Sequence, residues 1–221
     1  MLSWRERTKR ARELFALEEQ ALSSIGWAQS SKNALPRNQD GVCPWMVYSA
    51  IDWLDQVVSR SARVLEIGSG GSTIWWANRG CSVTAVESDE AWFLEISETL
   101  KDRGLADRVQ IHFKPDLVPE TLTDLAGSNF DVVVVDGPEP RMRYLAQGVE
   151  LLSGDGMLVL DNSDTGGLDV EEGLSRLDNF WRLDFFGLGP INLYAWQTSI
   201  FGRQPILPVS RPLGLRDSSS R

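Results

Sequence analysis

The sequence of 221 residues has little of the chemistry that many metal and hydrolytic centres need, because it contains one histidine and two cysteines. His112 stands alone, which excludes a metal site built from several histidines and a hydrolase that uses a histidine triad. Cys43 and Cys81 form no C-x-x-C pair. Idle thiols are typical of a reducing compartment, so we expect a cytoplasmic protein.

Long apolar runs and a basic patch are also missing. No run reaches the roughly 18 apolar residues of a membrane-spanning helix, and the charged start of the chain does not resemble a secretory signal. The formal net charge of -9 repels phosphate backbones. The chain also lacks G-x-S-x-G and G-x-x-x-x-G-K-[ST], the anchors of serine hydrolases and P-loop proteins. We therefore expect a small-molecule partner, with no nucleic acid and no membrane.

The pattern of apolar residues predicts an α/β protein. From residue 62, short apolar runs alternate with segments of helical periodicity, which is typical of a doubly wound, mostly parallel sheet covered on both faces. The expected strands are 63–68, 82–87, 108–113, 130–136, 156–161, 180–187 and 192–201. The expected helices of this part are 72–79, 89–103, 117–126, 140–152 and 168–178. We predict a helical extension over 1–58, a core over 59–202 and a mobile tail over 203–221.

The first strand of the core ends in a turn rich in glycine, within the stretch VLEIGSGGSTIWWA of residues 64–77. A strand that passes through glycines into a helix is a nucleotide-binding device, because the backbone approaches the ligand closely and the helix start presents free N–H groups. The dinucleotide fingerprint G-x-G-x-x-G/A fits poorly, since Thr73 takes its last position. Glu66, just before the turn, favours a ligand that carries positive charge where a dinucleotide carries phosphates.

The segment VLEIGSGGS resembles the first motif, E/D-x-G-x-G-x-G, of class I S-adenosylmethionine (SAM)-dependent methyltransferases, with Ser72 in the place of the third glycine. The resemblance extends over about residues 60–200. It implies a seven-stranded sheet whose last strand is antiparallel and lies between the sixth and the fifth, with the N-terminal extension over the cofactor cleft. It also implies that SAM is the cofactor and that its methionine moiety is held by Glu66, Gly68, Ser69, Gly70 and Ser72.

Acids after the next two strands extend this cofactor site. Glu87 ends the second strand of the core, 21 positions after Glu66, where a carboxylate accepts both hydroxyl groups of a ribose. Such a contact serves SAM and a dinucleotide equally, and the alternative for Glu87 is an acid that stabilises a helix start. Ser88 adjoins it in the predicted site. Asp116 follows the third strand, where the resemblance implies a contact with the adenine amino group and a helix N-cap is the alternative.

Asp136, Asp161 and Asn162 end two further strands at the ligand-binding edge of the predicted sheet, and their oxygens suit Mg²⁺ or Ca²⁺. Catechol-type and caffeoyl-CoA-type O-methyltransferases are similar here. That resemblance implies a divalent cation, such as Mg²⁺, that gathers the substrate's hydroxyl groups and lowers the pKa of the one to be methylated. The lysine that those families place after the first Asp is missing, and the segment carries Arg141 and Arg143 instead. The alternatives are catalysis by the acids alone, with Asp136 as the base, and a plain turn at Asp161 and Asn162.

These residues predict methyl transfer from SAM to a small-molecule acceptor, at an oxygen atom, with Asp136, Asp161 and Asn162 as the catalytic residues. Asp136 also belongs to the predicted cofactor site. Two other functions use the same features. An NAD-dependent oxidoreductase would share the sheet and the ribose-binding acid, although Thr73 and Glu66 disfavour it. A non-catalytic cofactor-binding partner protein would share the whole site.

Overall fold

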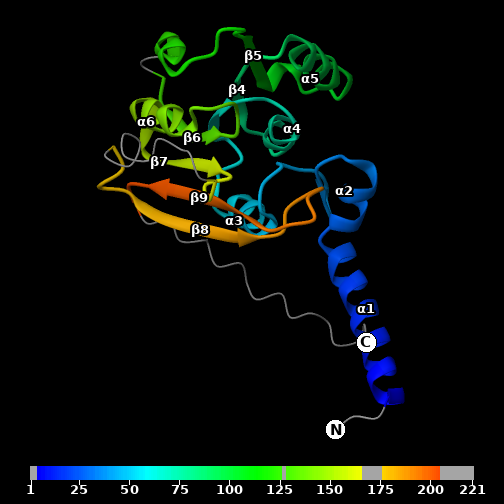
Figure 1. Ribbon diagram of the computed structural model, residues 1–221. Coiled ribbons are helices and arrows are strands. Elements are labelled where there is room, and N and C mark those ends of the chain that lie inside the picture. The colour runs from blue at the N-terminus through cyan, green and yellow to red at the C-terminus, as the bar shows by residue number, and fades with distance from the viewer. Residues whose placement is uncertain (1–3, 126–127, 166–175, 205–221) are drawn as a thin grey trace.

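The computed structural model describes residues 4–125, 128–165 and 176–204, and it has an α/β architecture built on one large mixed sheet (Figure 1). The expected helix at 168–178 falls mostly outside these residues, as does the expected tail from residue 205 onward. The helices are α1 (Trp4–Ser24), α2 (Trp27–Asn33), α3 (Tyr48–Val57), α4 (Gly71–Asn78), α5 (Glu90–Asp102), η1 (Ala106–Arg108), η2 (Pro119–Leu125) and α6 (Arg141–Leu151). The strands are β1 (Arg37–Asn38), β2 (Gly41–Val42), β3 (Arg63–Ile67), β4 (Ser82–Glu87), β5 (Val109–Phe113), β6 (Phe130–Val135), β7 (Leu152–Asp161), β8 (Trp181–Gly187) and β9 (Trp196–Gly202).

The large sheet has seven strands in the order β5-β4-β3-β6-β7-β9-β8. Strands β3 to β7 pair in parallel, because the helices between them return the chain to the same edge of the sheet. β9 lies between β7 and β8 and is antiparallel to both. The predicted fold class and the predicted place of the last strand are confirmed.

Each face of the sheet has its own hydrophobic core, because successive side chains of a strand point to opposite faces. Val132 and Val134 of β6 pack with residues of α3, α4 and α5. Val133 and Val135 pack on the other face with residues of α6 and η2. The run of four valines is therefore buried on both sides, as expected for a central strand of a doubly wound sheet.

The register of the central strands sets the position of the candidate site. Ile67 of β3 pairs with Val135 of β6, which pairs in turn with Leu160 of β7. The residues that follow these three therefore leave the sheet side by side at one edge. Gly68 and Asp136 come directly after two of them.

One expected α-helix, at 117–126, is the shorter 3₁₀ helix η2. The hydroxyl groups of Thr121 and Thr123 each donate to the carbonyl oxygen three residues earlier. Such side-chain bonds compete with the α-helical pattern and favour the tighter turn. The hydrophobic spacing predicted a helical segment here but could not predict its pitch.

The N-terminal extension does not lie over the carboxyl edge of the sheet as one unit. α1 projects away from the body, and its packing is mainly against α2 (Figure 1). After the β1–β2 hairpin, the backbone at Cys43 lies against Gly71, the first residue of α4. This later part of the extension is the part that reaches the glycine turn.

Two other features bear on the environment of the chain. No helix within the described ranges is both long and apolar enough to cross a membrane. Cys43 and Cys81 are buried and free, and burial raises the pKa of the Cys81 thiol. A buried thiol with a raised pKa stays protonated and unreactive.

The contact between the extension and α4 gives a test of the fold. A methyl group added at Gly71 would lie 2.7 Å from the backbone oxygen of Cys43. We expect Gly71→Ala to lower the free energy of unfolding by about 1–3 kcal/mol in urea titrations, because this crowding outweighs the better helix propensity of alanine. Gly154→Ala is the control, since no atom lies within 4 Å of the added methyl group. Equal stability of the two variants would show that the extension does not pack on the helix start.

Candidate functional site at the carboxyl edge of the sheet

The glycine turn between β3 and α4 is held by a buried hydrogen-bond relay. The backbone N–H of Gly70 donates to the Thr73 hydroxyl at 2.9 Å. That hydroxyl donates in turn to Oε2 of Glu66 at 2.6 Å. Thr73, which the sequence analysis weighed only as a mismatch to the dinucleotide pattern, therefore connects the acid to the turn. A threonine three residues after a glycine at a helix start was the available signal, because this spacing suits a capping interaction.

Glu66 lies beneath the turn rather than on its open surface, with 2% of the residue exposed. Its Oε1 atom has no hydrogen-bond partner among the described residues. Burial raises the pKa of Glu66 to about 7, and the polar groups of Thr73, Ser72 and Trp76 limit this rise. The turn thus covers a carboxyl group that changes charge near neutral pH and has one oxygen unsatisfied.

Gly68 meets two requirements of the turn. Its φ of 100° is in the left-handed region that favours glycine. A side chain there would also meet the loop after β6, because an added methyl group would lie 3.3 Å from the backbone oxygen of Asp136. The glycine turn and the loop that carries Asp136 are therefore in contact.

Glu87 binds the turn from the side, at the end of β4. Its Oε2 accepts the backbone N–H and the hydroxyl of Ser69, at 3.0 and 2.8 Å. Its Oε1 accepts the N–H groups of Ser88 and Asp89, at 2.8 and 2.9 Å. Four hydrogen bonds fill the acceptor sites of one carboxylate. The hydroxyl of Ser69 is the one side-chain donor among these four, so it is the group that can turn away from Glu87 without moving the backbone.

Trp92, in the first turn of α5, lies beside the same turn and was not singled out from the sequence. Its indole Nε1 donates to the backbone oxygen of Ser69 at 2.6 Å, and a methyl group added at Gly70 would lie 3.6 Å from its ring. The residue is 41% exposed. Asp116, by contrast, is exposed in the turn after β5, and its predicted contact with adenine stays a prediction.

Arg141, in the first turn of α6, joins the two strands that carry the other acids. Its Nε donates to the backbone oxygen of Gly137 at 2.9 Å. Its Nη1 donates to the backbone oxygen of Asp161 at 2.8 Å and to Oδ1 of Asn162 at 2.9 Å. Its Nη2 lies 3.8 Å from Oδ1 of Asp136. A guanidinium ion therefore lies among the three residues predicted as metal ligands.

Asp136 keeps 28% of its side chain exposed, so it can meet a ligand at this edge. Desolvation raises its pKa well above the ordinary value, and the negative charges of Asp161 and Glu66 add to the rise. The nearby Arg141 acts in the opposite direction. A carboxylate with a raised pKa is a better proton acceptor than an ordinary aspartate.

The carboxylate of Asp161 is turned toward β9 instead. The hydroxyl of Thr198 donates to its Oδ1 at 2.5 Å, and the indole Nε1 of Trp196 lies 3.1 and 3.2 Å from its two oxygens. Burial raises the pKa of Asp161 to about 6, although Thr198 and Trp196 favour the charged form. Asn162 has a φ of 52°, typical of the turn that was the alternative at this position.

These contacts do not fit a divalent cation. The oxygens of Asp161 are engaged by β9, the side-chain oxygen of Asn162 by Arg141, and the guanidinium would repel a second cation. Within the described ranges, no three or more His, Cys, Asp and Glu side chains are placed to hold a metal ion. The predicted Mg²⁺ thus has no support in this geometry.

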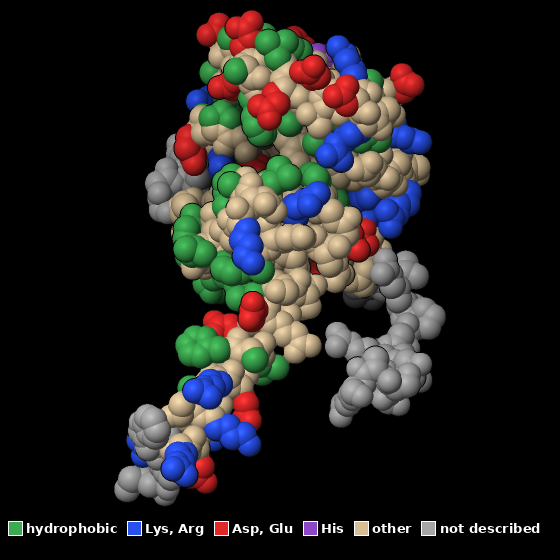
Figure 2. Space-filling view, turned by 90° about the vertical axis from the view of Figure 1, so that its right-hand side faces the viewer, with side chains coloured by type: hydrophobic (Ala, Val, Ile, Leu, Met, Phe, Trp, Pro, Cys, Tyr) green, Lys and Arg blue, Asp and Glu red, His purple; other side chains and the backbone are tan. Residues whose placement is uncertain are grey.

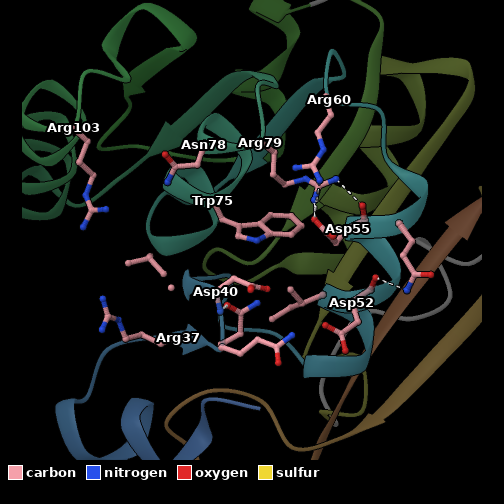
Figure 3. Close-up of a pocket in the computed structure, with 15 residues that line it drawn as sticks. Arg37, Asp40, Asp52, Asp55, Arg60, Trp75, Asn78, Arg79 and Arg103 are labelled. Carbon is pink, nitrogen blue, oxygen red and sulfur yellow. Dashed lines mark hydrogen bonds and ion pairs between the residues drawn. The ribbon is translucent and has the colours of Figure 1, made fainter. Parts of the chain in front are cut away.

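A hollow of about 660 Å³ lies elsewhere, between the β1–β2 hairpin, α3 and α4 (Figure 3). Asp55 in its wall forms an ion pair with Arg60. The guanidinium of Arg79 forms an ion pair with Asp55 and lies 4.6 Å from the centre of the Trp75 ring. None of the predicted site residues lines this hollow. The candidate site is therefore the carboxyl edge of the sheet.

Comparison with known proteins gives likenesses in structure only, since no protein-family model and no curated protein matches the sequence. The chain is similar to the cofactor-bound protein Rv0187 from MTB, at 24% identity and a TM-score of 0.56, over 69% of this chain and 77% of that one. It is similar to the O-methyltransferase TomG from Streptomyces achromogenes in complex with SAM, at 20% identity and a TM-score of 0.54, over 69% of this chain and 76% of that one. It is also similar to an rRNA methylase from Streptococcus thermophilus, at 18% identity and a TM-score of 0.57, over 71% of this chain and 96% of that one. The chain thus has the fold of SAM-dependent methyltransferases.

The raised pKa of Glu66 predicts how stability depends on pH. The folded protein holds this proton more tightly than the unfolded chain, so the contribution is present at low pH and is lost as pH rises from about 4.5 to about 7. We expect Glu66→Gln, which cannot ionise, to be more stable than the wild type at pH 8 by about 3 kcal/mol, with a smaller difference at pH 4. Urea titrations across this range measure the effect. A pH profile of stability for Glu66→Gln that is identical to that of the wild type would contradict the buried titration.

Proposed function

We propose that the protein is a methyltransferase that uses SAM and methylates an oxygen atom of a small molecule. The observation that carries this proposal is the buried carboxyl group of Glu66 beneath the glycine turn, whose Oε1 has no hydrogen-bond partner in the part of the chain that the structure describes. An acid at this position attracts a cation and repels a diphosphate, so it suits the positively charged methionine end of SAM better than a dinucleotide. The fold shared with methyltransferases supports the same choice.

The residues of the turn fit this cofactor. Glu66 would supply the negative potential, and the open side of the turn, with Gly68 and Gly70, would admit the methionine moiety. Glu87 would accept a ribose hydroxyl group at the site that the Ser69 hydroxyl leaves when it turns away. Each of these contacts follows from a donor or acceptor already placed at the edge of the sheet.

SAM supplies an activated methyl group, so the chain has to position the acceptor and accept its proton. Asp136 is the group for the second task, because its pKa is raised and part of its side chain is open to a ligand. Arg141 would hold Asp136 in place and stabilise the negative charge that develops on the acceptor oxygen. Asp161 and Asn162 would then act by positioning, since both contact Arg141.

The guanidinium of Arg141 would take over the role of the predicted cation, and the reaction would need no Mg²⁺. The charge lies in the right place, among the ends of β6 and β7. It is also fixed by hydrogen bonds to the backbone oxygens of Gly137, in the loop after β6, and of Asp161, at the end of β7. A fixed positive charge at a developing oxyanion lowers the barrier without a metal.

The acceptor is proposed to be small because the whole chain is acidic, with a net charge of -9. One structural neighbour is an rRNA methylase, so an RNA acceptor is the alternative to exclude. A polyanion would have to approach against this charge, which makes RNA the poorer candidate. A cytoplasmic setting would agree with the two buried free thiols.

Cofactor binding tests the first half of the proposal. Calorimetric titration should show binding of S-adenosylhomocysteine and none of NAD. Glu87→Ala should weaken that binding by about 1–3 kcal/mol, because charge-assisted hydrogen bonds to the ribose are lost. Ser69→Ala is the matched control, expected to bind equally or more tightly because it removes the hydroxyl that competes for Glu87. Preferential binding of NAD would support the oxidoreductase, and binding without transfer to any acceptor would support a non-catalytic partner protein.

The catalytic role of Asp136 is tested by transfer of a radiolabelled methyl group to a panel of small hydroxyl compounds. Asp136→Asn should lower kcat by about 10²–10⁴ while binding of S-adenosylhomocysteine changes much less. Asp131→Asn, near the other end of the same strand, should retain activity. A chelator should leave the wild-type rate unchanged. Loss of activity with the chelator and recovery with Mg²⁺ would restore the metal mechanism, and transfer to RNA alone would overturn the small acceptor.

A further inference from the structure

α1 is a helix of 21 residues whose contacts with the other described elements are mainly with α2. It extends from the body in two views at right angles, with hydrophobic and charged side chains along its length (Figures 1 and 2). Leu14, Phe15 and Leu17 are 58%, 72% and 63% exposed. These large apolar side chains remain in water in a single copy of the chain.

The apolar residues of α1 fall mainly on one side of the helix. On a helical projection, Ala11, Leu14, Phe15, Ala21 and Leu22 lie on one side of the helix, which also carries Arg7 and Glu18. A helix in a protein gains most of its stability from packing such a face against another part of the structure. The helix therefore needs a partner surface.

The charges of α1 are divided between its two halves. Residues 5–12 contain five basic residues and one acidic residue, whereas residues 13–24 contain three acidic residues and no basic one. Two parallel copies of this helix would place like charges together. Two antiparallel copies would place the basic half of each against the acidic half of the other, so the charge pattern selects that arrangement.

We propose that α1 pairs with α1 of a second copy of this chain, as an antiparallel helix pair around a two-fold axis at Leu14. In this register Leu14 packs on its own counterpart and Ala11 on Leu17 of the partner subunit. Arg10 faces Glu18 of the partner subunit, and both lie on the apolar side of the helix. The two-fold axis repeats this ion pair, which is how an isologous interface works.

The pair would be a reversible dimer. The helix is about 32 Å long, at 1.5 Å per residue, and one face of it is a small interface by the standard of stable complexes. The bodies would lie at opposite ends of the pair, since each α1 leaves its own body at the C-terminal end (Figure 1). Each glycine turn would remain free to bind its cofactor, so this inference does not depend on the proposed methyl transfer.

Sedimentation equilibrium of the full chain over a range of concentrations tests the dimer. The molar mass of the wild type should rise from that of one chain to that of two chains as concentration rises. Arg10→Glu places two carboxylates together at both symmetry-related pairs, and Glu18→Arg places two guanidinium groups together there, so each variant should weaken the dimer about tenfold or more. The double variant Arg10→Glu with Glu18→Arg should regain the wild-type dissociation constant, because the pairs are again opposite in charge.

Mixing the two single variants is the sharpest control. Each repels itself, but in a mixed dimer of the Arg10→Glu and Glu18→Arg chains one pair joins two introduced charges of opposite sign and the other joins the two native ones. The mixture should therefore dimerise better than either variant alone.

Titration with S-adenosylhomocysteine should be the same for all of these proteins, which separates this inference from the proposed function. A wild type that is monomeric at every concentration would overturn this inference. So would a dimer whose dissociation constant is the same in the wild type, in Arg10→Glu and in Glu18→Arg. Binding of a monomeric chain to anionic lipid vesicles through α1 would overturn it in favour of a membrane surface.

Discussion

The buried hydrogen bond from Thr73 to Glu66 is the contact on which the candidate site depends. It fixes the acid to the glycine turn, and the turn to the first residues of α4. Because Gly68 also lies against the loop after β6, the position of that turn sets where Asp136 can lie. This buried contact thus fixes the glycine turn, and the register of β3 and β6 places that turn beside the loop that carries Asp136.

Carboxyl groups gathered at one edge have a physical cost. Glu66, Asp136 and Asp161 each have a raised pKa, and Asp136 is affected by both of the others. Arg141 is the cation placed to offset this charge, and it does so for Asp136 and Asp161. A carboxyl group with a raised pKa lowers the stability of the folded protein at neutral pH, because its charged form is held in an unfavourable place. The same raised pKa allows it to exchange a proton with a ligand. The edge is therefore better suited to chemistry than to stability.

Much of the fold could be predicted from the sequence because the signals are local. The valines of residues 132–135 mark a strand buried on both faces, and their neighbours alternate with helices at a spacing that requires a parallel sheet. Glu66 and Glu87 were found from local signals too, since Glu66 comes just before the glycine turn and Glu87 ends a predicted strand. The pitch of η2 and the projection of α1 were not predictable, because both depend on which contacts compete in the folded chain.

The sequence by itself determined the sheet and the edge at which the acids lie, and the place of the antiparallel last strand followed from the resemblance of its glycine motif to that of methyltransferases. Only the tertiary structure decided what those acids do there. Thr198 and Trp196 turn Asp161 toward β9, although both lie more than 30 residues further along the chain. Arg141 enters the space that a cation was expected to fill. Hydrophobic periodicity is a property of neighbours in sequence, whereas the partners of a buried carboxylate are chosen by strands and helices that meet only on folding.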